Sequence, residues 1–321
     1  MRGRWLGGAL GVMLLLGACG DPESEPLPVP PPAPRATGTT HQNAAPSPSP
    51  SVPPPAPKAT GTTHQDAAPS PTPPPTRDLS VVYLGDSLAM ENQTVLGEEL
   101  RRTLGAAYTS APYSGTTLCD YLEGTGARSL VPDADKAAAL VRRERPDVVV
   151  LQFWGNAWGY TPCMDGITYD ASRERYLDRY AADAARLTEQ IAAAGGERRP
   201  RIVWVLQGPD PITPERVELV NGLYREQAAA TGDALADAGR VVSRAGDRYT
   251  WVGQLPCTDY ERAHPTYCTE PAKGLTALHR DDDYLHFCLA PTTSTPRPCP
   301  VRSPGILRMA QEITRAVGTA R

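Results

Sequence analysis

The sequence predicts an α/β domain in which a mostly parallel sheet is covered by helices on both faces. First, strand patterns and helix patterns alternate along the chain from residue 80 to residue 317. Second, the strongest strand candidates are continuous apolar runs, at residues 81–84, 147–153 and 201–207. Such runs are typical of strands buried on both faces, and repeated strand–helix units favour a parallel sheet.

The first strand–helix unit carries the first functional candidate. Residues 81–84 form an apolar strand that stops at Gly85, and residues 88–104 place apolar side chains at helical spacing. Ser87 lies where the helix begins, and free main-chain N–H groups there favour a nearby anion. That position suits a nucleophilic hydroxyl whose reaction produces an oxyanion. The simpler interpretation is that Asp86 or Ser87 only caps the helix.

The remaining elements continue the alternation. Further strands are predicted at residues 106–111, 147–153 and 201–207, with a short last strand at Val241-Val242. Further helices are predicted at residues 133–143, 171–194, 214–230 and 304–317, and an irregular, cysteine-containing region at 249–304. In parallel sheets, functional groups collect in loops just beyond the carboxyl ends of the strands.

The first 19 residues predict an export signal. Arg2 and Arg4 precede a short apolar run that ends in Leu16-Gly17-Ala18, directly before Cys19. This pattern is typical of a secretory signal and is too short for a membrane span. Because it resembles a bacterial lipoprotein signal, we expect Cys19 to be lipidated and to anchor the chain to the outer face of the bacterial cytoplasmic membrane. Ordinary secretion with an incidental cysteine is the alternative.

Residues 20–76 predict a disordered, Pro-rich linker. A repeat that starts at Pro30 returns nearly unchanged from Pro53, and almost nothing in it is apolar enough to form a core. At ~3.1 Å per residue in polyproline II, it could hold residues 77–321 about 170 Å from the anchor. His41 and His64 occupy equivalent repeat positions, which indicates copying of a spacer rather than a metal site.

Charge and cysteine usage narrow the class of protein. The net charge of −4 and the lack of a basic stripe indicate no nucleic-acid partner. Besides Cys19 there are six cysteines, and an even count behind a secretory signal indicates three disulfides in an oxidising compartment. Zinc binding is the alternative, but the sequence has no close Cys pair or Cys/His cluster for it. About fifteen pairings are possible. Equal local spacing suggests Cys257–Cys268 and Cys288–Cys299, which leaves Cys119–Cys163.

Three further features suit acyl transfer together with Ser87. Gly115 follows the second strand, where a glycine allows a main-chain N–H to approach a ligand closely. Asn156 follows the third strand and offers a neutral hydrogen-bond donor for an oxyanion. Late in the chain, Asp283 precedes His286 by three residues, so its carboxylate can hold one ring nitrogen while the other accepts a proton.

In these motifs the chain resembles the SGNH (GDSL-type) hydrolase family. The matching strings, in family order, are Gly85-Asp86-Ser87-Leu88, Gly115, Asn156 and Asp283-x-x-His286. The resemblance implies a flavodoxin-like three-layer α/β/α fold and hydrolysis of esters without a metal or cofactor. It implies Ser87 as nucleophile, His286 as general base and Asp283 as its orienting carboxylate. The main-chain N–H groups of Ser87 and Gly115 and the side chain of Asn156 would form the oxyanion hole.

The chain departs from the family pattern in its second block, which lacks the longer Gly-rich string common in the family, and in its third block. The third block of the family usually reads Gly-x-Asn-Asp, whereas here Gly155 directly precedes Asn156 and Ala157 replaces the aspartate. Next to Asp283, Asp281 and Asp282 could take the orienting role if the register shifted. Seen alone, each of Gly115, Asn156 and His286 also suits a structural role in a turn or a packed loop.

The other aromatic and histidine residues have simpler interpretations. Trp154, Trp158 and Tyr160 could form a stacking platform for a sugar ring or a wall for an acyl chain, but packing of at least two of them within their loop is favoured. His264 and His279 lack a comparable carboxylate spacing, so we interpret them as surface or loop residues.

The sequence as a whole predicts an exported, lipid-anchored serine esterase that acts as a monomer on acyl lipids or O-acylated glycans. The alternatives are an O-acyltransferase that uses the same site and a non-catalytic glycan-binding or structural lipoprotein. A Cys119–Cys163 bond would tie together the loops of Gly115 and Asn156, and a Cys288–Cys299 bond would anchor the loop of His286. We therefore expect these disulfides to preorganise the site.

Overall fold

The computed structural model describes residues 78–156, 158, 160–291 and 296–320. The predicted signal peptide with Cys19 and the Pro-rich repeat lie outside the described residues, so both stay predictions. Within the described ranges, no helix has the length and apolar character needed to cross a bilayer.

Five parallel strands form the central sheet, in the spatial order β2-β1-β3-β4-β5. The strands are β1 (Ser80–Gly85), β2 (Ala107–Ser110), β3 (Val148–Gln152), β4 (Arg201–Val205) and β5 (Ala234–Ala236). This order and the parallel pairing confirm the predicted α/β class and its flavodoxin-like arrangement.

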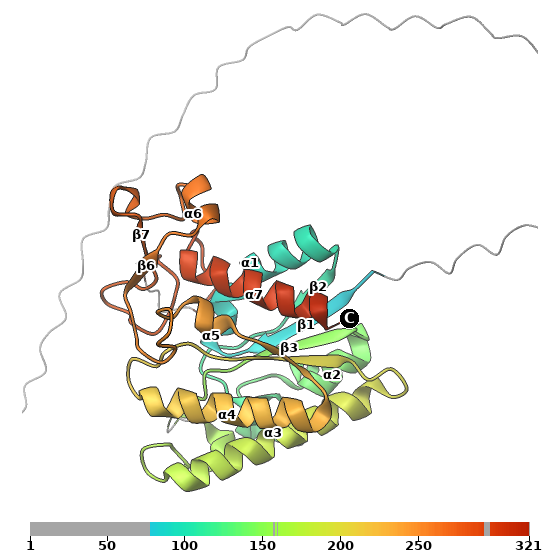
Figure 1. Cartoon of the computed structure of the whole chain (residues 1–321). Helices are drawn as coiled ribbons and strands as arrows, with labels where there is room; N and C mark the ends of the chain where they lie inside the picture. The colour runs from blue at the N-terminus through green and yellow to red at the C-terminus, as the bar shows by residue number, and fades with distance from the viewer. Residues whose placement is uncertain (1–77, 157, 159, 292–295, 321) are drawn as a thin grey trace, which may run out of the picture. The chain divides into compact units, whose positions relative to one another are not determined.

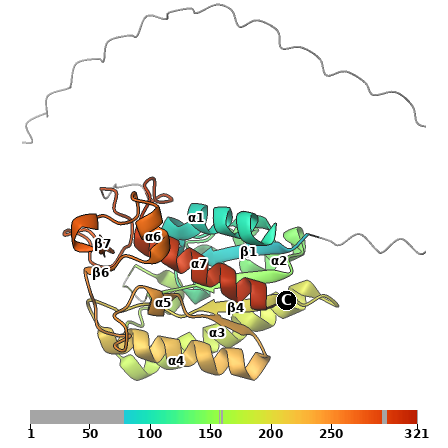
Figure 2. The ribbon, with the colours of Figure 1, turned by 45° about the horizontal axis from the view of Figure 1, so that its top comes forward.

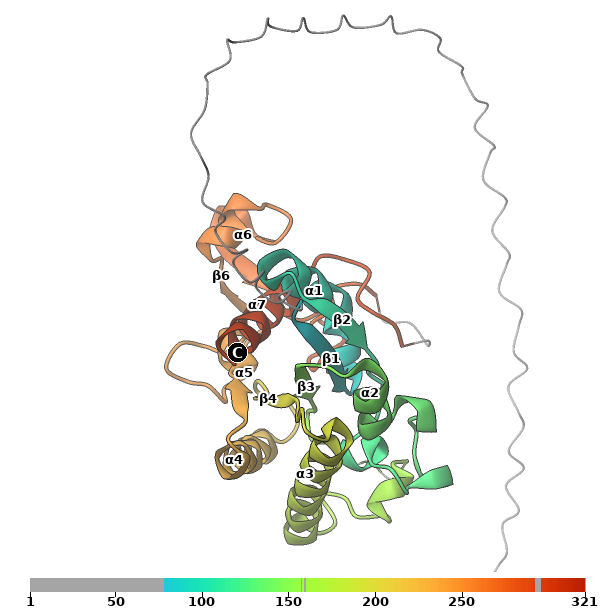
Figure 3. The ribbon, with the colours of Figure 1, turned by 90° about the vertical axis from the view of Figure 1, so that its right-hand side faces the viewer.

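Helices cover both faces of this sheet. On one face lie α1 (Ser87–Leu104), α5 (Ala238–Val241) and α7 (Pro304–Thr319), and on the other lie α2 (Ala137–Glu144), α3 (Arg173–Gly195) and α4 (Pro214–Thr231). Figure 1 shows the two helical layers with the sheet between them, and Figure 3 shows the same layers from the side. The predicted three-layer sandwich is therefore confirmed.

The three inner strands, β1, β3 and β4, contribute side chains to two separate cores. In β1, Val81 and Tyr83 join the core beneath α1 and α7, while Val82 and Leu84 join the core beneath α2 and α3. All four are almost fully buried. Because successive side chains of a strand point to opposite faces, a strand between two helical layers needs apolar residues at every position. The continuous apolar runs that predict the strands therefore reflect burial on both faces.

The last strand of the sheet differs from its predicted place. Val241 ends the short helix α5 and Val242 follows it, whereas β5 is Ala234–Ala236. The prediction of a strand at Val241-Val242 is wrong because it relied on β-branched side chains. The strand instead forms where the chain meets the free edge of β4, with Leu206 N–H donating to the Ala236 carbonyl at 2.8 Å.

The predicted helix at residues 133–143 is interrupted at Lys136. A 3₁₀ turn (Asp133–Asp135) precedes α2, and Lys136 between them has extended dihedral angles. Its side chain is fully buried, and the ammonium donates to the Asp120 carbonyl, to Thr125 Oγ1 at 3.0 Å and to Ser129 Oγ. A buried ammonium needs such acceptors, so its partners set the break in the helix.

The irregular region before α7 is held by covalent and ionic links. It contains the antiparallel pair β6 (Gln254–Pro256) and β7 (Leu275–Ala277) and the short helix α6 (Asp259–Ala263), which lie beside the start of α7 (Figure 2). A buried ion pair joins Arg308 of α7 to Glu261 of α6 at 2.6 Å. The three disulfides have the predicted connectivity: Cys119–Cys163, Cys257–Cys268 and Cys288–Cys299.

Candidate active site

The junction of β1 and α1 places Ser87 at the carboxyl edge of the sheet. Gly85 is required there because a Cβ atom would lie 2.1 Å from the Gln152 carbonyl oxygen of β3. Asp86 is the N-cap of α1, with its side chain accepting the Leu88 N–H at 3.0 Å. The capping interpretation thus holds for Asp86, and it leaves the hydroxyl of Ser87 available for another partner.

That partner is His286, from a loop 199 residues further along the chain. Its Nε2 lies 3.0 Å from Ser87 Oγ, and its Nδ1 lies 3.0 Å from one carboxylate oxygen of Asp283 and 3.2 Å from the other. Since an ionised carboxylate can only accept, Nδ1 carries the proton and Nε2 is free to accept the hydroxyl hydrogen of Ser87. The His286 main-chain N–H also donates to Asp283, at 3.1 Å, which fixes the loop around the pair.

Electrostatics keep Asp283 charged and His286 basic. Burial disfavours the Asp283 carboxylate, but its hydrogen bonds and the nearby imidazole charge outweigh burial and lower its pKa to about 2. Burial likewise disfavours a charged imidazole at His286. The hydrogen bond that His286 donates to Asp283 and the negative charge of Glu91 outweigh burial, so the pKa of His286 lies above its ordinary value.

The loop that carries His286 is held from two sides. The carboxylate of Glu91 on α1 accepts the Phe287 N–H at 3.0 Å, and Cys288 is bonded to Cys299. On the other side, His279 Nδ1 lies 2.9 Å from the His286 carbonyl oxygen, with its ring against Phe287. His279 is a loop residue, one of the two predicted possibilities, but it is half-buried and supports the histidine loop. His264 is exposed, as predicted.

Asp86 and Asn156 bring the other motifs to the same edge. One carboxylate oxygen of Asp86 accepts the Trp154 N–H at 2.6 Å and lies 3.4 Å from Asn156 Nδ2. The same Nδ2 donates to the Thr116 carbonyl at 3.1 Å, directly after Gly115. Burial raises the pKa of Asp86 to about 6, although its main-chain hydrogen bonds oppose that effect. The first, second and third motifs are thus joined by hydrogen bonds.

Tyrosines and tryptophans fix the main chain that presents Asn156. The Tyr176 hydroxyl donates to the Gly155 carbonyl at 2.6 Å, and the Tyr224 hydroxyl donates to the Phe153 carbonyl at 2.9 Å. Trp158 Nε1 donates to Asn156 Oδ1 at 3.2 Å, which determines which end of the amide is the donor. These contacts hold residues 153–156, although the sequence lacks the usual Gly-x-Asn-Asp order.

Two of the three aromatic residues of that loop pack inside the protein, as favoured from the sequence. Trp154 is buried, and the guanidinium of Arg216 lies 4.1 Å from its ring centroid and 5.7 Å from that of Trp158. Arg216 is itself buried and is paired with Asp210 at 2.8 Å. Tyr160 is 58% exposed, so it is the member of the three that can face a ligand.

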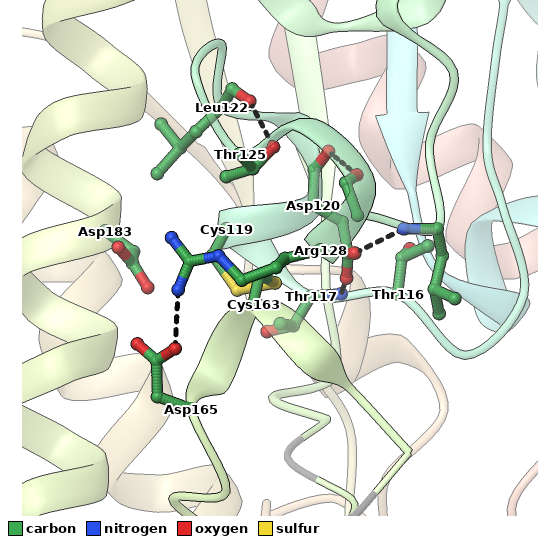
Figure 4. The surroundings of a disulfide bond; sticks show 12 residues. Thr116, Thr117, Cys119, Asp120, Leu122, Thr125, Arg128, Cys163, Asp165 and Asp183 are labelled. Atoms are coloured by element: carbon green, nitrogen blue, oxygen red, sulfur yellow. Dashed lines mark hydrogen bonds and ion pairs between the residues drawn. A yellow bond between two sulfur atoms is a disulfide. The ribbon is translucent and has the colours of Figure 1, made fainter.

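The loop after β2 contains Gly115 and, four residues later, Cys119 of the Cys119–Cys163 bond. Gly115 has φ +76°, a conformation that side-chain-bearing residues rarely adopt, and the Tyr160 ring lies 3.2 Å from the position of a Cβ. The disulfide joins the 3₁₀ turn Leu118–Tyr121 to the turn Pro162–Met164, beside the Arg128–Asp165 ion pair (Figure 4). Among the described residues, the cluster with metal-like spacing is Cys119, Asp120 and Cys163, and its sulfurs are already bonded to each other.

A pocket of about 190 Å³ opens beside the Ser87 hydroxyl. The residues that line it include Met90, Ser114, Pro291, Pro300 and the disulfide-bonded Cys288 and Cys299. Arg280 and Arg297 also line it. Because Glu91 and Asp283 line it as well, both acidic and basic groups border this small space next to the nucleophile.

Sequence reasoning missed several of these supporting residues. Glu91 follows Ser87 by four residues on α1, and this helical spacing is a signal that could have placed it on the same face. The contacts of Arg216 with Trp154 and of Tyr176 with Gly155 carry no local signal, because each joins segments that are distant in the sequence. Asp282 pairs with Arg280, so Asp283 is the aspartate that reaches His286.

Comparison with known proteins adds the following findings. No protein-family model and no curated protein matches the chain. Similar solved structures include one described as a GDSL-like lipase from Parabacteroides merdae, with 12% identity, a TM-score of 0.42 and coverage of 75% of this chain and 96% of that chain. A family 3 carbohydrate esterase from Clostridium thermocellum has the same four values. The psychrotrophic esterase EstA from Pseudoalteromonas has 12% identity, a TM-score of 0.40 and coverage of 75% and 98%.

Proposed function

We propose that this chain is a serine esterase of the SGNH type, which hydrolyses carboxylic esters through an acyl-enzyme on Ser87. The observation that carries the proposal is the hydrogen-bonded series Ser87–His286–Asp283, with contacts of 3.0 Å at each end of the imidazole. A hydroxyl with a base on one side and a carboxylate behind that base is the arrangement of a nucleophilic triad.

In the first half-reaction, Ser87 Oγ attacks the ester carbonyl carbon while its proton moves to His286 Nε2. The new C–O bond gives a tetrahedral intermediate whose negative charge lies on the former carbonyl oxygen. When the intermediate collapses, His286 returns the proton to the leaving alkoxide, and the acyl group stays on Ser87. Asp283 remains ionised throughout and stabilises the imidazolium.

In the second half-reaction, water takes the place of the alcohol. His286 accepts a proton from the water as it attacks the acyl carbon, and it then returns this proton to Ser87 Oγ as the acid leaves. The free serine and the neutral histidine are restored, so the cycle needs no metal or redox cofactor.

Three donors would stabilise the oxyanion: the main-chain N–H groups of Ser87 and Gly115 and the Nδ2 group of Asn156. The position of Ser87 at the start of α1 adds the positive end of the helix dipole. We expect the 3.4 Å contact of Asn156 with Asp86 to be the one exchanged for the substrate, because it is longer than the 3.1 Å contact with Thr116.

The pocket favours a small acyl group. Its volume of about 190 Å³ is close to that of a cavity of roughly 150 Å³ that holds one benzene molecule. We therefore expect acetyl or butyryl esters to be hydrolysed faster than palmitoyl esters. Of the two predicted substrate classes, an O-acylated glycan of the cell envelope would supply such an ester, whereas an acyl lipid carries longer acyl chains. We expect the enzyme to work as a monomer.

The proposed location is the outer face of the bacterial cytoplasmic membrane, with the lipid on Cys19, or the medium if Cys19 is not lipidated. The signal-like start of the sequence and the three disulfides support export. Fatty-acid labelling of the wild-type chain and of Cys19→Ala tests the anchor. We expect label and membrane association in the wild type and neither in the variant.

Hydrolysis of p-nitrophenyl acetate and butyrate by the purified protein tests the activity. We expect Ser87→Ala to lower kcat by about 10⁴-fold or more, with little change in Tm because the serine side chain is small and partly exposed. Equal rates of ester hydrolysis by the wild type and by a folded Ser87→Ala would refute the proposal.

A further inference from the structure

We propose that Glu91 is a positioning residue, which holds His286 against Ser87 and helps to set the charge state of the imidazole. The proposal rests on the esterase function of the same site. Glu91 lies one helical turn after Ser87 on α1, so the two side chains share a face of the helix. Glu91 acts on His286 in two ways: through a hydrogen bond to the main chain of the histidine loop and through the negative charge of its carboxylate.

Glu91 connects both ends of the Cys288–Cys299 loop to α1. Its carboxylate accepts the Phe287 N–H at 3.0 Å, and its main-chain carbonyl accepts the Cys299 N–H at 3.2 Å. Because Phe287 directly follows His286, the first bond fixes the peptide that carries the imidazole. The helix that presents the nucleophile therefore also holds the loop that presents the base.

The charge of Glu91 also acts on the base. Burial raises the pKa of Glu91 to about 7, while the nearby imidazole and the Phe287 N–H oppose burial. The carboxylate therefore gains and loses its proton near neutral pH. When it is ionised, its negative charge stabilises the protonated form of His286 and so raises the pKa of that imidazole.

The other charged groups near the pair come from three segments. The groups that face Glu91 or His286 are Asp86 at the start of α1, His279, Arg280 and Asp283 around the histidine loop, and Arg297 across the pocket. Asp283, with its pKa of about 2, stays ionised near neutral pH. Asp86 and Glu91 are the two carboxyl groups of this set whose charge changes near neutrality, and Glu91 affects the pKa of His286 more strongly.

Two substitutions separate the anchor from the charge. Glu91→Gln keeps an oxygen that accepts the Phe287 N–H but removes the charge, whereas Glu91→Ala removes both. Glu98→Gln, at an exposed position on the same helix, is the matched control. The measurements are the pH profile of kcat/KM with p-nitrophenyl butyrate and the NMR titration of His286, whose signal is assigned with His286→Asn.

We expect Glu91→Gln to lower the pKa of His286 by about 0.5 pH unit and to move the acid limb of kcat/KM by the same amount. At the high-pH plateau, we expect kcat of Glu91→Ala to be about tenfold lower than that of Glu91→Gln, since only the alanine variant lacks the anchor. Glu98→Gln should match the wild type in both measurements.

Either of two results overturns the proposal: an unchanged pKa of His286 in Glu91→Gln, or equal plateau kcat values for Glu91→Ala and Glu91→Gln. If Glu91→Ala fails to fold, the titration of Glu91→Gln decides. A wild-type protein that hydrolyses no ester would refute the esterase function instead, and the NMR titration would still measure the effect of Glu91 on the imidazole.

Discussion

The two halves of the candidate site are built in different ways. Ser87 lies at the end of β1, a strand paired on both sides, and at the start of an 18-residue helix. His286 lies in an irregular segment, where Asp283, Glu91 and His279 hold it with side-chain hydrogen bonds and a disulfide closes the loop. Main-chain ladders place the nucleophile, and individual side chains place the base.

This difference has a physical consequence. A main-chain ladder keeps its geometry when exposed side chains change, because its donors and acceptors belong to the backbone. A loop held by a few side-chain bonds moves when any of them is lost, and an error of about 1 Å in a catalytic group can cost about 100-fold in rate. We therefore expect substitutions around His286 to lower activity with little loss of folding.

The largest expected effect on the histidine half comes from Asp283. Asp283→Asn removes the acceptor that selects the imidazole tautomer, so we expect kcat to fall by about 10³–10⁴-fold. Esterase assays with Asp281→Asn and Asp282→Asn provide matched controls, which should stay within about twofold of the wild type. If Asp282→Asn lost more activity than Asp283→Asn, Asp282 and not Asp283 would be the aspartate that orients His286.

The next largest effect is expected at Asn156, the proposed side-chain donor to the oxyanion. Asn156→Ala removes one donor to the oxyanion, and we expect kcat to fall by about 10²–10³-fold while KM changes little. Trp158→Phe, which removes only the indole donor to Asn156 Oδ1, should cause a smaller loss of kcat. If Asn156→Ala kept full kcat, the main-chain donors alone would have to stabilise the oxyanion.

Two disulfides allow a direct comparison of a bond beside the site with a bond away from it. Cys257–Cys268 and Cys288–Cys299 each link cysteines 11 residues apart, but only the second borders the site. We expect removal of either, as a Cys→Ser pair, to lower the free energy of unfolding by a similar amount, about 2–3 kcal/mol. Only removal of Cys288–Cys299 should lower kcat/KM, by about tenfold. Equal kcat/KM values for the two variants, measured under conditions where both are folded, would contradict preorganisation of the site by Cys288–Cys299.

The smallest effect is a shift in pH dependence. His286 must be neutral to accept the proton of Ser87, and its pKa is raised, so kcat/KM should reach half its maximum above pH 6.5. Asp283 has a lowered pKa, so its contribution to stability is present above the unfolded-state value of about 4 and is lost as the pH falls towards 2. Rate profiles of the wild type measure the first limit, and acid denaturation of the wild type and Asp283→Asn measures the second. A half-maximum of kcat/KM below pH 6.5 would contradict the first expectation.

The sequence by itself determined the parts that depend on neighbouring residues. Apolar runs predicted β1, β3 and β4, and Gly85 with Asp86 marked the turn into α1. Equal spacing predicted the disulfides of the irregular region, because short loops bring their ends together readily. Order along the chain predicted which residue types collect at the carboxyl edge of the sheet.

Only the tertiary structure decided which of these groups touch. It paired Ser87 with His286 across 199 residues, chose Asp283 over its two neighbours, and recruited Glu91 to the histidine loop. It also placed β5 at an alanine-rich segment and broke a helix at Lys136. The reason is that propensity and periodicity describe a residue and its near neighbours, whereas burial and hydrogen-bond partners are set by whatever segment packs against it.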